Sequence, residues 1–353
     1  MKLQEQVLTY ITQRTNHLAE EIALVVCYGS YVTGNATALS DVDVFYIPRS
    51  KNHELSETFI LKGIGYDIFP LSWEILEEIA DFKNGLSPLL GDSRVIYSYS
   101  PQELQRFEDL QKQMQRQLAD KQLMQERAIA RLKKAGQLNQ KIQHTDSLSF
   151  ARELAGKQLS SLSESIAYQN QTYFHKGMKE QYQELQKMDA LPEDFLQGYQ
   201  AILQAQTLPV LQQAAKKLFT SACAFLHQPE ACYPEPVLTS GIPGSKPDYH
   251  QAASWYEEVC SSFNKIYSCE QTGNAALAFL TAGSLQNSLK EDLSIDLATT
   301  DLLSFYDFKD LTRLSKQARA IERDCEISII AGGGTIHRYE TVDELYQRHG
   351  ISR

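Results

Sequence analysis

The length and composition of the chain suit a globular protein of two domains and exclude a disordered or fibrous one. It has 353 residues, of which 42% are hydrophobic and 22% are charged, and its formal net charge is −10. A long nucleic acid is not an expected partner, because phosphate contacts need a basic stripe that this acidic sequence lacks. No apolar run approaches the ~20 residues of a membrane span, and the N-terminus lacks the apolar core of a signal peptide. We therefore expect a cytoplasmic protein without a membrane partner.

The first hundred residues alternate between helical and strand patterns. Apolar residues at helical spacing indicate helices, whereas short apolar runs with β-branched residues indicate strands. Ser72 is a suitable N-cap for one of the helices. We expect an α/β (α+β) domain over residues 1–100, with a mixed sheet flanked by helices. The predicted elements are a helix over 2–20, strands over 22–28, 42–47 and about 58–69, a helix over 72–79 and a strand over 94–99.

Helical patterns dominate the rest of the chain. An apolar stripe in a Gln- and Lys-rich segment from Pro101 to about Gly136 predicts one long helix. Pro/Gly-rich stretches at 228–236 and 240–247 predict breaks between helices. We expect a mostly helical second domain over residues 101–353. Its other predicted helices cover 147–174, 192–205, 209–225 and 249–268.

A short polar segment after the first predicted strand carries the residues best suited to chemistry. A Gly-Ser turn at the end of a strand can present backbone N–H groups and a hydroxyl to phosphate oxygens. Asp41 and Asp43, two positions apart on a predicted strand, project from one face with Cα atoms ~6.5 Å apart. Two such carboxylates repel unless a cation neutralises them, and hard oxygen ligands suit Mg²⁺. The segment reads Gly29-Ser30-x3-Gly34-x5-Ser40-Asp41-x-Asp43.

A third carboxylate lies on the next predicted strand. Asp67 is flanked by apolar residues in Gly65-Tyr66-Asp67-Ile68-Phe69. From a neighbouring strand it could complete a site for two metal ions ~3.5 to 4 Å apart. Each feature alone is unspecific, because a Gly-Ser pair is usually only a turn and an Asp-x-Asp pair is usually a solvated strand face. Their joint order and spacing is the informative signal.

This order resembles the signature of the polymerase β-type nucleotidyltransferase superfamily. The motif is similar to the form found in small-molecule members, which modify aminoglycosides and lincosamides. The resemblance covers about residues 20–70 tightly and the helical remainder only loosely. It implies that Mg²⁺ is the metal and that an NTP, by family habit ATP, is the co-substrate. The site residues it implies are Asp41, Asp43 and Asp67 for catalysis and metal binding, and Gly29, Ser30 and Ser40 for contacts to the triphosphate.

The reaction that the resemblance implies is attack by an acceptor hydroxyl on the α-phosphorus of the NTP, with release of pyrophosphate. The expected acceptor is a small hydroxylated molecule. An antibiotic is one candidate, because aminoglycosides are polycations and suit an acidic cleft, and the protein would then confer antibiotic resistance. Two alternatives stay open: nucleotidylylation of a protein or an RNA, and a non-catalytic nucleotide- or partner-binding module on the same fold. A homodimer is open as well.

In the same family the helical domain can contribute a glutamate as general base. The predicted helix over 147–174 carries Glu153 and Glu164; we favour Glu164, and a solvated surface glutamate is the plain alternative. Lys179, or Lys176 as the alternative, lies in a segment similar to an Asn-Tyr-Lys element of bacterial relatives. A lysine there could bind the triphosphate as a point charge, although an ordinary exposed lysine fits the pattern too.

Overall fold

The computed structural model describes residues 2–34, 36, 40–51, 53–228 and 247–351. The breaks expected at 228–236 and 240–247 fall almost wholly outside these residues. The chain forms two compact units, and the expected ranges 1–100 and 101–353 only approximate them. Unit 1 consists of 1–119, 256–261 and 335–353, whereas unit 2 consists of 120–255 and 262–334.

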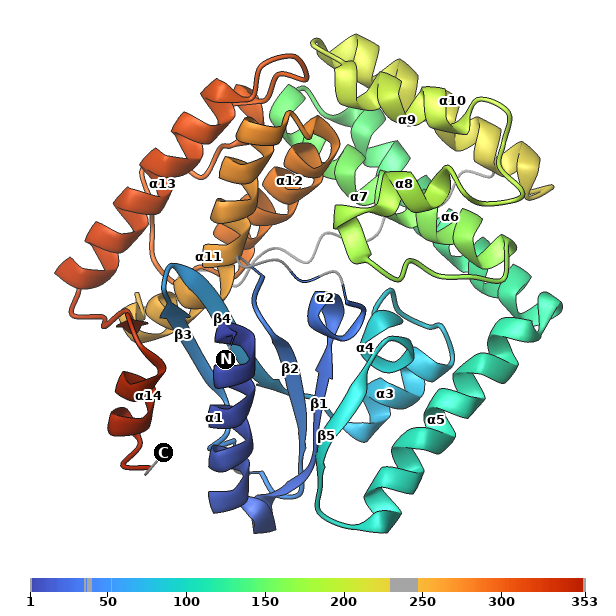
Figure 1. Ribbon diagram of the computed structural model, residues 1–353. Helices are drawn as coiled ribbons and strands as arrows, with labels where there is room; N and C mark the ends of the chain where they lie inside the picture. Colours follow the sequence, from blue (N-terminus) through green and yellow to red (C-terminus); the bar gives the residue numbers. More distant parts are fainter. Residues whose placement is uncertain (1, 35, 37–39, 52, 229–246, 352–353) are drawn as a thin grey trace. The chain divides into compact units, whose positions relative to one another are not determined.

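Unit 1 is an α/β structure built on a six-stranded mixed sheet, with strand order β5-β1-β2-β4-β3-β6 (Figure 1). The β1–β2, β1–β5 and β3–β4 pairs are antiparallel, and the β2–β4 and β3–β6 pairs are parallel. This agrees with the mixed sheet that the sequence predicts. The strands are β1 (Ile22–Tyr28), β2 (Asp43–Pro48), β3 (Glu57–Leu61), β4 (Ile64–Pro70), β5 (Arg94–Ser98) and β6 (Arg338–Tyr339).

The single strand predicted over 58–69 is wrong, because the segment folds back on itself as the β3–β4 hairpin. Lys62 and Gly63 form its two-residue turn, with φ values of 53° and 77°. Two consecutive positive φ values match a type I′ turn, whose twist suits antiparallel strands. The excessive length of the predicted strand and the glycine near its middle were the signals for this turn.

Helices from different parts of the chain pack on the sheet of unit 1. On one face α1 (Leu3–His17) and α14 (Val342–Arg348) pack on a core that includes Val25, Val44 and Ile68. The middle of α11 packs on the other face, against Gly65, and the unit also contains α2, α3, α4 and α5. In chain order the bounds of these helices are Gly29–Val32, Trp73–Ala80, Pro88–Gly91, Pro101–Ala119 and Tyr249–Thr272. The expected cap of α3 is confirmed, since the Ser72 side chain accepts from the Ile75 N–H at 3.4 Å.

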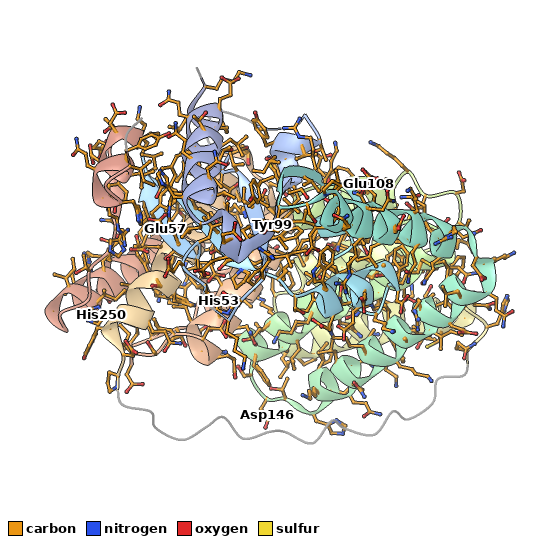
Figure 2. All side chains as sticks on the ribbon, turned by 90° about the horizontal axis from the view of Figure 1, so that it is seen from below. His53, Glu57, Tyr99, Glu108, Asp146 and His250 are labelled. Atoms are coloured by element: carbon orange, nitrogen blue, oxygen red, sulfur yellow. The ribbon has the colours of Figure 1, made fainter. Side chains whose placement is uncertain are left out.

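The end of the chain is part of unit 1, although the sequence placed it in a helical domain. Strand β6 extends the sheet beside β3, and α14 contributes Leu345 and Tyr346 to the core. The buried carboxylate of Glu57, beside α1 in Figure 2, accepts a hydrogen bond from Arg14 at 2.6 Å and another from His349 at 2.8 Å. The C-terminal segment therefore helps to close the core under the sheet.

The described part of unit 2 consists of helices and the loops that join them. The helix predicted over 101–136 is two helices, because Asp120 ends the first stretch and caps the next by accepting from the Gln122 and Leu123 N–H groups. Helix α7 is buried on nearly all sides, which explains its high content of Ala, Ser and Leu. None of the helices that the structure describes is long and apolar enough to span a membrane. The main helices are α6 (Lys121–His144), α7 (Leu148–Gln169), α9 (Phe195–Gln204), α10 (Leu208–Phe225), α12 (Ala275–Glu291) and α13 (Thr312–Ala331), with both ends of α11.

Candidate active site

Strand register places two of the predicted carboxylates next to each other in unit 1. Asp43 is the first residue of β2 and lies opposite Tyr28, the last residue of β1. Strands β2 and β4 are parallel, with Val44 opposite Ile68, so Asp43 and Asp67 take neighbouring positions. Adjacent strands are about 4.8 Å apart, and residues at paired positions point to the same face. Asp43 and Asp67 therefore share one face of the sheet, opposite the face that α1 covers.

Gly29 brings the backbone close to one of these carboxylates. It follows β1, begins the single turn of α2 and has a φ of +73°. A Cβ built on Gly29 would lie 2.0 Å from Oδ2 of Asp43, far inside van der Waals contact. Only glycine combines this backbone conformation with this close approach. The predicted strand–Gly-Ser turn thus has a specific physical reason, with Ser30 half-buried as the next residue.

An aromatic cluster lies on the same face as the carboxylates. The rings of Tyr28, Phe45 and Phe69 have centroids 6.0 to 6.4 Å apart. Burial raises the pKa of the Tyr28 hydroxyl well above its usual range, and the charges of Asp43, Asp67 and Asp41 raise it further. The charges of all three predicted carboxylates therefore act on one half-buried tyrosine, which sequence reasoning did not single out.

Asp67 lies in an environment that penalises its negative charge. Burial raises the pKa of Asp67 to about 7, and the nearby charge of Glu258, from the middle of α11, adds to the shift. A buried carboxylate next to another negative charge gains stability from a bound cation. Glu258 has no local sequence signal as a site residue, because only the fold of unit 1 brings it near Asp67.

The segment just before β2 is held by the first helix. Gln4 on α1 donates a hydrogen bond from Nε2 to the backbone oxygen of Ser40 at 2.9 Å. The side chain of Asp41 is half-buried, and Val42 after it is packed in the core. Positions 35 and 37–39 of the motif lie outside the described residues. Ser40 and Asp41 are thus tethered to unit 1 next to Asp43.

The chemistry of these side chains fits a hard divalent cation such as Mg²⁺. The donors are carboxylate oxygens, Asp43 and Asp67 are neighbours on one face, and burial and the charge of Glu258 disfavour the ionised form of Asp67. Within the residues described, no group of three or more His, Cys, Asp or Glu side chains is arranged to hold a metal ion as it stands. Asp43 and Asp67 therefore form a shared acidic face of the sheet, which is not a closed coordination shell. We call this pair of carboxylates the acidic face.

The other two predicted residues, Glu164 and Lys179, belong to unit 2. Glu164 is ion-paired with Arg131 at 3.0 Å; burial raises the pKa of Glu164, and the charge of Arg131 acts against that rise. Lys179 is exposed at the end of a short 3₁₀ turn, Gly177–Lys179. The catalytic role of Glu164 and the phosphate-binding role of Lys179 stay predictions.

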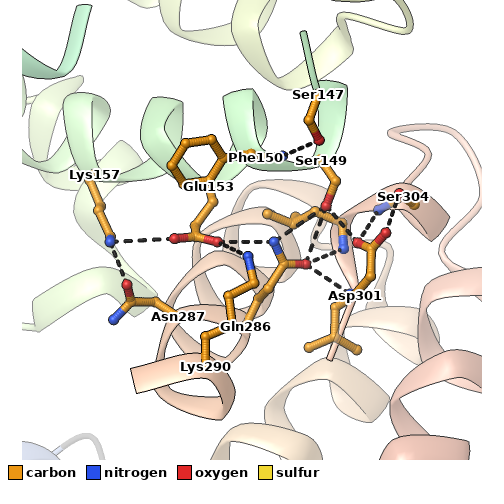
Figure 3. Close-up of polar contacts among 12 residues, drawn as sticks. Ser147, Ser149, Phe150, Glu153, Lys157, Gln286, Asn287, Lys290, Asp301 and Ser304 are labelled. Carbon is orange, nitrogen blue, oxygen red and sulfur yellow. Dashed lines mark hydrogen bonds and ion pairs between the residues drawn. The ribbon is translucent and has the colours of Figure 1, made fainter. Parts of the chain in front are cut away.

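Glu153, the alternative to Glu164, is buried and hydrogen-bonded within unit 2 (Figure 3). Its side chain is 3% exposed and accepts hydrogen bonds from Lys290 at 2.8 Å and Gln286 at 3.0 Å. Lys157 lies 3.5 Å from the other carboxylate oxygen. The position therefore joins α7 to α12, and the solvated surface that the sequence left open for Glu153 is wrong.

The fold of unit 1 is an α/β domain in which Asp43 and Asp67 are neighbours on one face of the sheet. Residues 8–124 match the family described as the nucleotidyltransferase domain. The chain therefore carries a nucleotidyltransferase domain of the polymerase β-like superfamily. No curated protein matches the sequence significantly.

Proposed function

We propose that the protein transfers a nucleotide from a Mg-NTP, ATP in our expectation, to a hydroxyl of a small-molecule acceptor and releases pyrophosphate. One observation carries the proposal: Asp43 and Asp67 are neighbours on one sheet face, and Gly29 lies directly against the Asp43 carboxylate. This supports the roles expected from the sequence, in which Asp41, Asp43 and Asp67 hold the metal ion.

The residues of the site divide the work in a simple way. Asp41 and Asp43 would bind Mg²⁺ on the triphosphate, while Gly29 and Ser30 would approach its phosphate oxygens. Asp67 would bind the metal ion together with Asp41 and Asp43, and the charge of the ion would offset the burial that raises the pKa of this carboxyl. When bound, Mg²⁺ would neutralise the charge that develops on the phosphoryl oxygens.

The experiment measures Mg²⁺-dependent pyrophosphate release from each of the four common NTPs, with a panel of aminoglycosides, lincosamides and nucleosides as acceptors. We expect release with one NTP and one class of acceptor, and at least a ~100-fold loss in Asp43→Asn. Asp109→Asn is the matched control, since Asp109 is exposed on α5 and accepts hydrogen bonds from its helix neighbours Gln105 and Lys112. Transfer that survives in Asp43→Asn would remove the assignment.

The alternatives correspond to different outcomes of the same assay. Release that requires a protein or an RNA would replace the small-molecule acceptor, and RNA binding would weaken steeply with salt. Mg-NTP binding without release under any acceptor would leave a non-catalytic binding module. The formal net charge of −10 favours a small cationic acceptor, such as an aminoglycoside.

Two residues of unit 2 complete the proposal. Glu164 would act as general base in its ionised form, because burial raises its pKa and thereby makes the carboxylate a stronger proton acceptor. Lys179 would contribute charge to the triphosphate. A Glu164→Gln variant should lower kcat with little change in the KM for the NTP, and Lys179→Ala should raise that KM about fivefold or more without a change in melting temperature. Unchanged kinetics in either variant would remove that residue from the site.

A further inference from the structure

A buried glutamate on α11 is held in unit 1 by two separate segments of the chain. Glu257 is fully buried, with 0% of its surface exposed. Its Oε2 accepts a hydrogen bond from the Thr58 hydroxyl on β3 at 2.6 Å. Its Oε1 accepts from the backbone N–H of His337, and His337 Nδ1 lies 2.9 Å away. Removing a hydrogen-bond partner from a buried carboxylate costs stability, so the position of the Glu257 side chain is tightly defined.

Thr58 is the link between this glutamate and the acidic face. In the β3–β4 hairpin Thr58 lies directly opposite Asp67. Residues opposite each other in antiparallel strands have Cβ atoms ~4.5 to 5.5 Å apart on the same face. The hydrogen bond from Thr58 to Glu257 therefore fixes the hairpin at the position of Asp67.

Close backbone packing adds to this connection. A Cβ built on Gly65 of β4 would lie 2.5 Å from the backbone oxygen of Glu257 and 3.3 Å from Cβ of Cys260. The middle of α11 thus contacts β4 two residues before Asp67. Glu257 and Gly65 together hold this part of α11 on the hairpin.

We propose that Glu257 is a positioning residue, which through Thr58 and the α11–β4 packing holds Asp67 where it binds the metal ion. The inference rests on the proposed function, because it assigns Asp67 to the metal. It goes beyond that function by giving the acidic face a support from α11 and from the C-terminal segment that carries His337. Groups that orient metal ligands in this way typically change metal affinity 10- to 100-fold when they are removed.

The test measures Mn²⁺ binding to the full-length protein directly, with Mn²⁺ as a probe for Mg²⁺, together with the melting temperature. We expect Glu257→Gln and Thr58→Val to weaken Mn²⁺ binding about tenfold or more. Thr58→Ser keeps the hydroxyl and should bind Mn²⁺ as the wild type does. Glu57→Gln is the matched control. Glu57 is the residue before Thr58 and is also buried, but it points to the opposite face, toward α1.

The readout separates positioning from plain stability. A structural role alone would lower the melting temperature of Glu257→Gln and Glu57→Gln alike and leave Mn²⁺ affinity unchanged in both, and that result would overturn the inference. Absence of Mn²⁺ binding by the wild-type protein would overturn both the metal assignment and the inference. Intact Mn²⁺ binding without pyrophosphate release would remove the proposed transfer reaction, and the variants would still decide the role of Glu257.

Discussion

Gly29 and the carboxylate of Asp43 lie so close together that a Cβ on the glycine would be 2.0 Å from Oδ2 of the aspartate. The first prediction is that Gly29→Ala displaces Asp43 and lowers Mg-NTP affinity or kcat/KM by ~100-fold, as a misplacement of about 1 Å can. Titration calorimetry with Mg-NTP measures the affinity without an acceptor.

The chain supplies a matched control for backbone strain. Gly63 has nearly the same φ, +77°, but a Cβ built there meets nothing within 4 Å. Gly63→Ala should therefore lose only the ~1 kcal/mol that a left-handed alanine costs, and should keep its affinity for Mg-NTP. Equal effects of the two variants on that affinity would contradict the steric explanation.

The second prediction concerns the cost of the Asp67 charge in the metal-free protein. The folded pKa of Asp67, about 7, is above its ordinary value of 3.8. The protonated form is favoured by folding, so stability is lost as the pH rises from about 4 through 7 and is then constant. Asp67→Asn removes this loss, and at pH 8 without metal it should be more stable than the wild type by roughly 1 to 3 kcal/mol after allowance for solvent screening.

Thermal unfolding at pH 4 and at pH 8, with and without Mg²⁺, checks this expectation. At pH 4 the two proteins should be nearly equal, because Asp67 is then largely protonated when folded. Added Mg²⁺ should raise the melting temperature of the wild type at pH 8 but not that of Asp67→Asn. An Asp67→Asn variant that is less stable than the wild type without metal at pH 8 would show that burial does not disfavour this charge.

The sequence predicted the local structure around the candidate site well, because that structure is encoded within a short stretch. The apolar run of β1, the Gly-Ser turn and the alternation around Asp43 report on neighbouring residues in the chain. The match of residues 8–124 to the nucleotidyltransferase domain confirms the resemblance that this stretch carries. Strand β3 was merged with β4 because the turn at Lys62 and Gly63 is short and lies between two apolar runs.

Contacts between residues far apart in the sequence could not be predicted from the sequence pattern. Glu257 and Glu258 lie about two hundred residues from Thr58 and Asp67 in the sequence, and periodicity within α11 does not reveal what lies across from it. The C-terminal segment was missed for the same reason, since a two-residue strand such as β6 has no periodic signal. Only the folded sheet shows that these segments belong to unit 1.

The third prediction tests whether the end of the chain stabilises the nucleotidyltransferase domain. Tyr346 on α14 is 4% exposed, and its ring packs edge-to-face on Tyr10 of α1 with centroids 5.4 Å apart. Tyr346→Ala should cost roughly 3 kcal/mol, as large core truncations of aromatic residues do. The exposed Tyr99 is the control, and Tyr99→Ala should cost less than about 1 kcal/mol. Urea unfolding would measure both, and equal effects would contradict a core role for α14.

The fourth prediction concerns the buried carboxylate of Glu57. Burial by itself would raise the pKa of Glu57, but the hydrogen bond from His349 and the charge of Arg14 outweigh it, so the pKa is lowered from 4.5. A lowered folded pKa means that the ionised carboxylate contributes stability above pH 4.5, and that this contribution is lost as the pH falls through the folded value. At pH 7 Glu57→Gln should therefore be less stable than the wild type by roughly 1 to 3 kcal/mol, and the difference should shrink in acid.

The exposed Glu54 provides the control, because Glu54→Gln should leave stability nearly unchanged at every pH. A difference between wild type and Glu57→Gln that stays constant from pH 7 to pH 3 would show that shape, rather than charge, is what Glu57 contributes between α1 and α14.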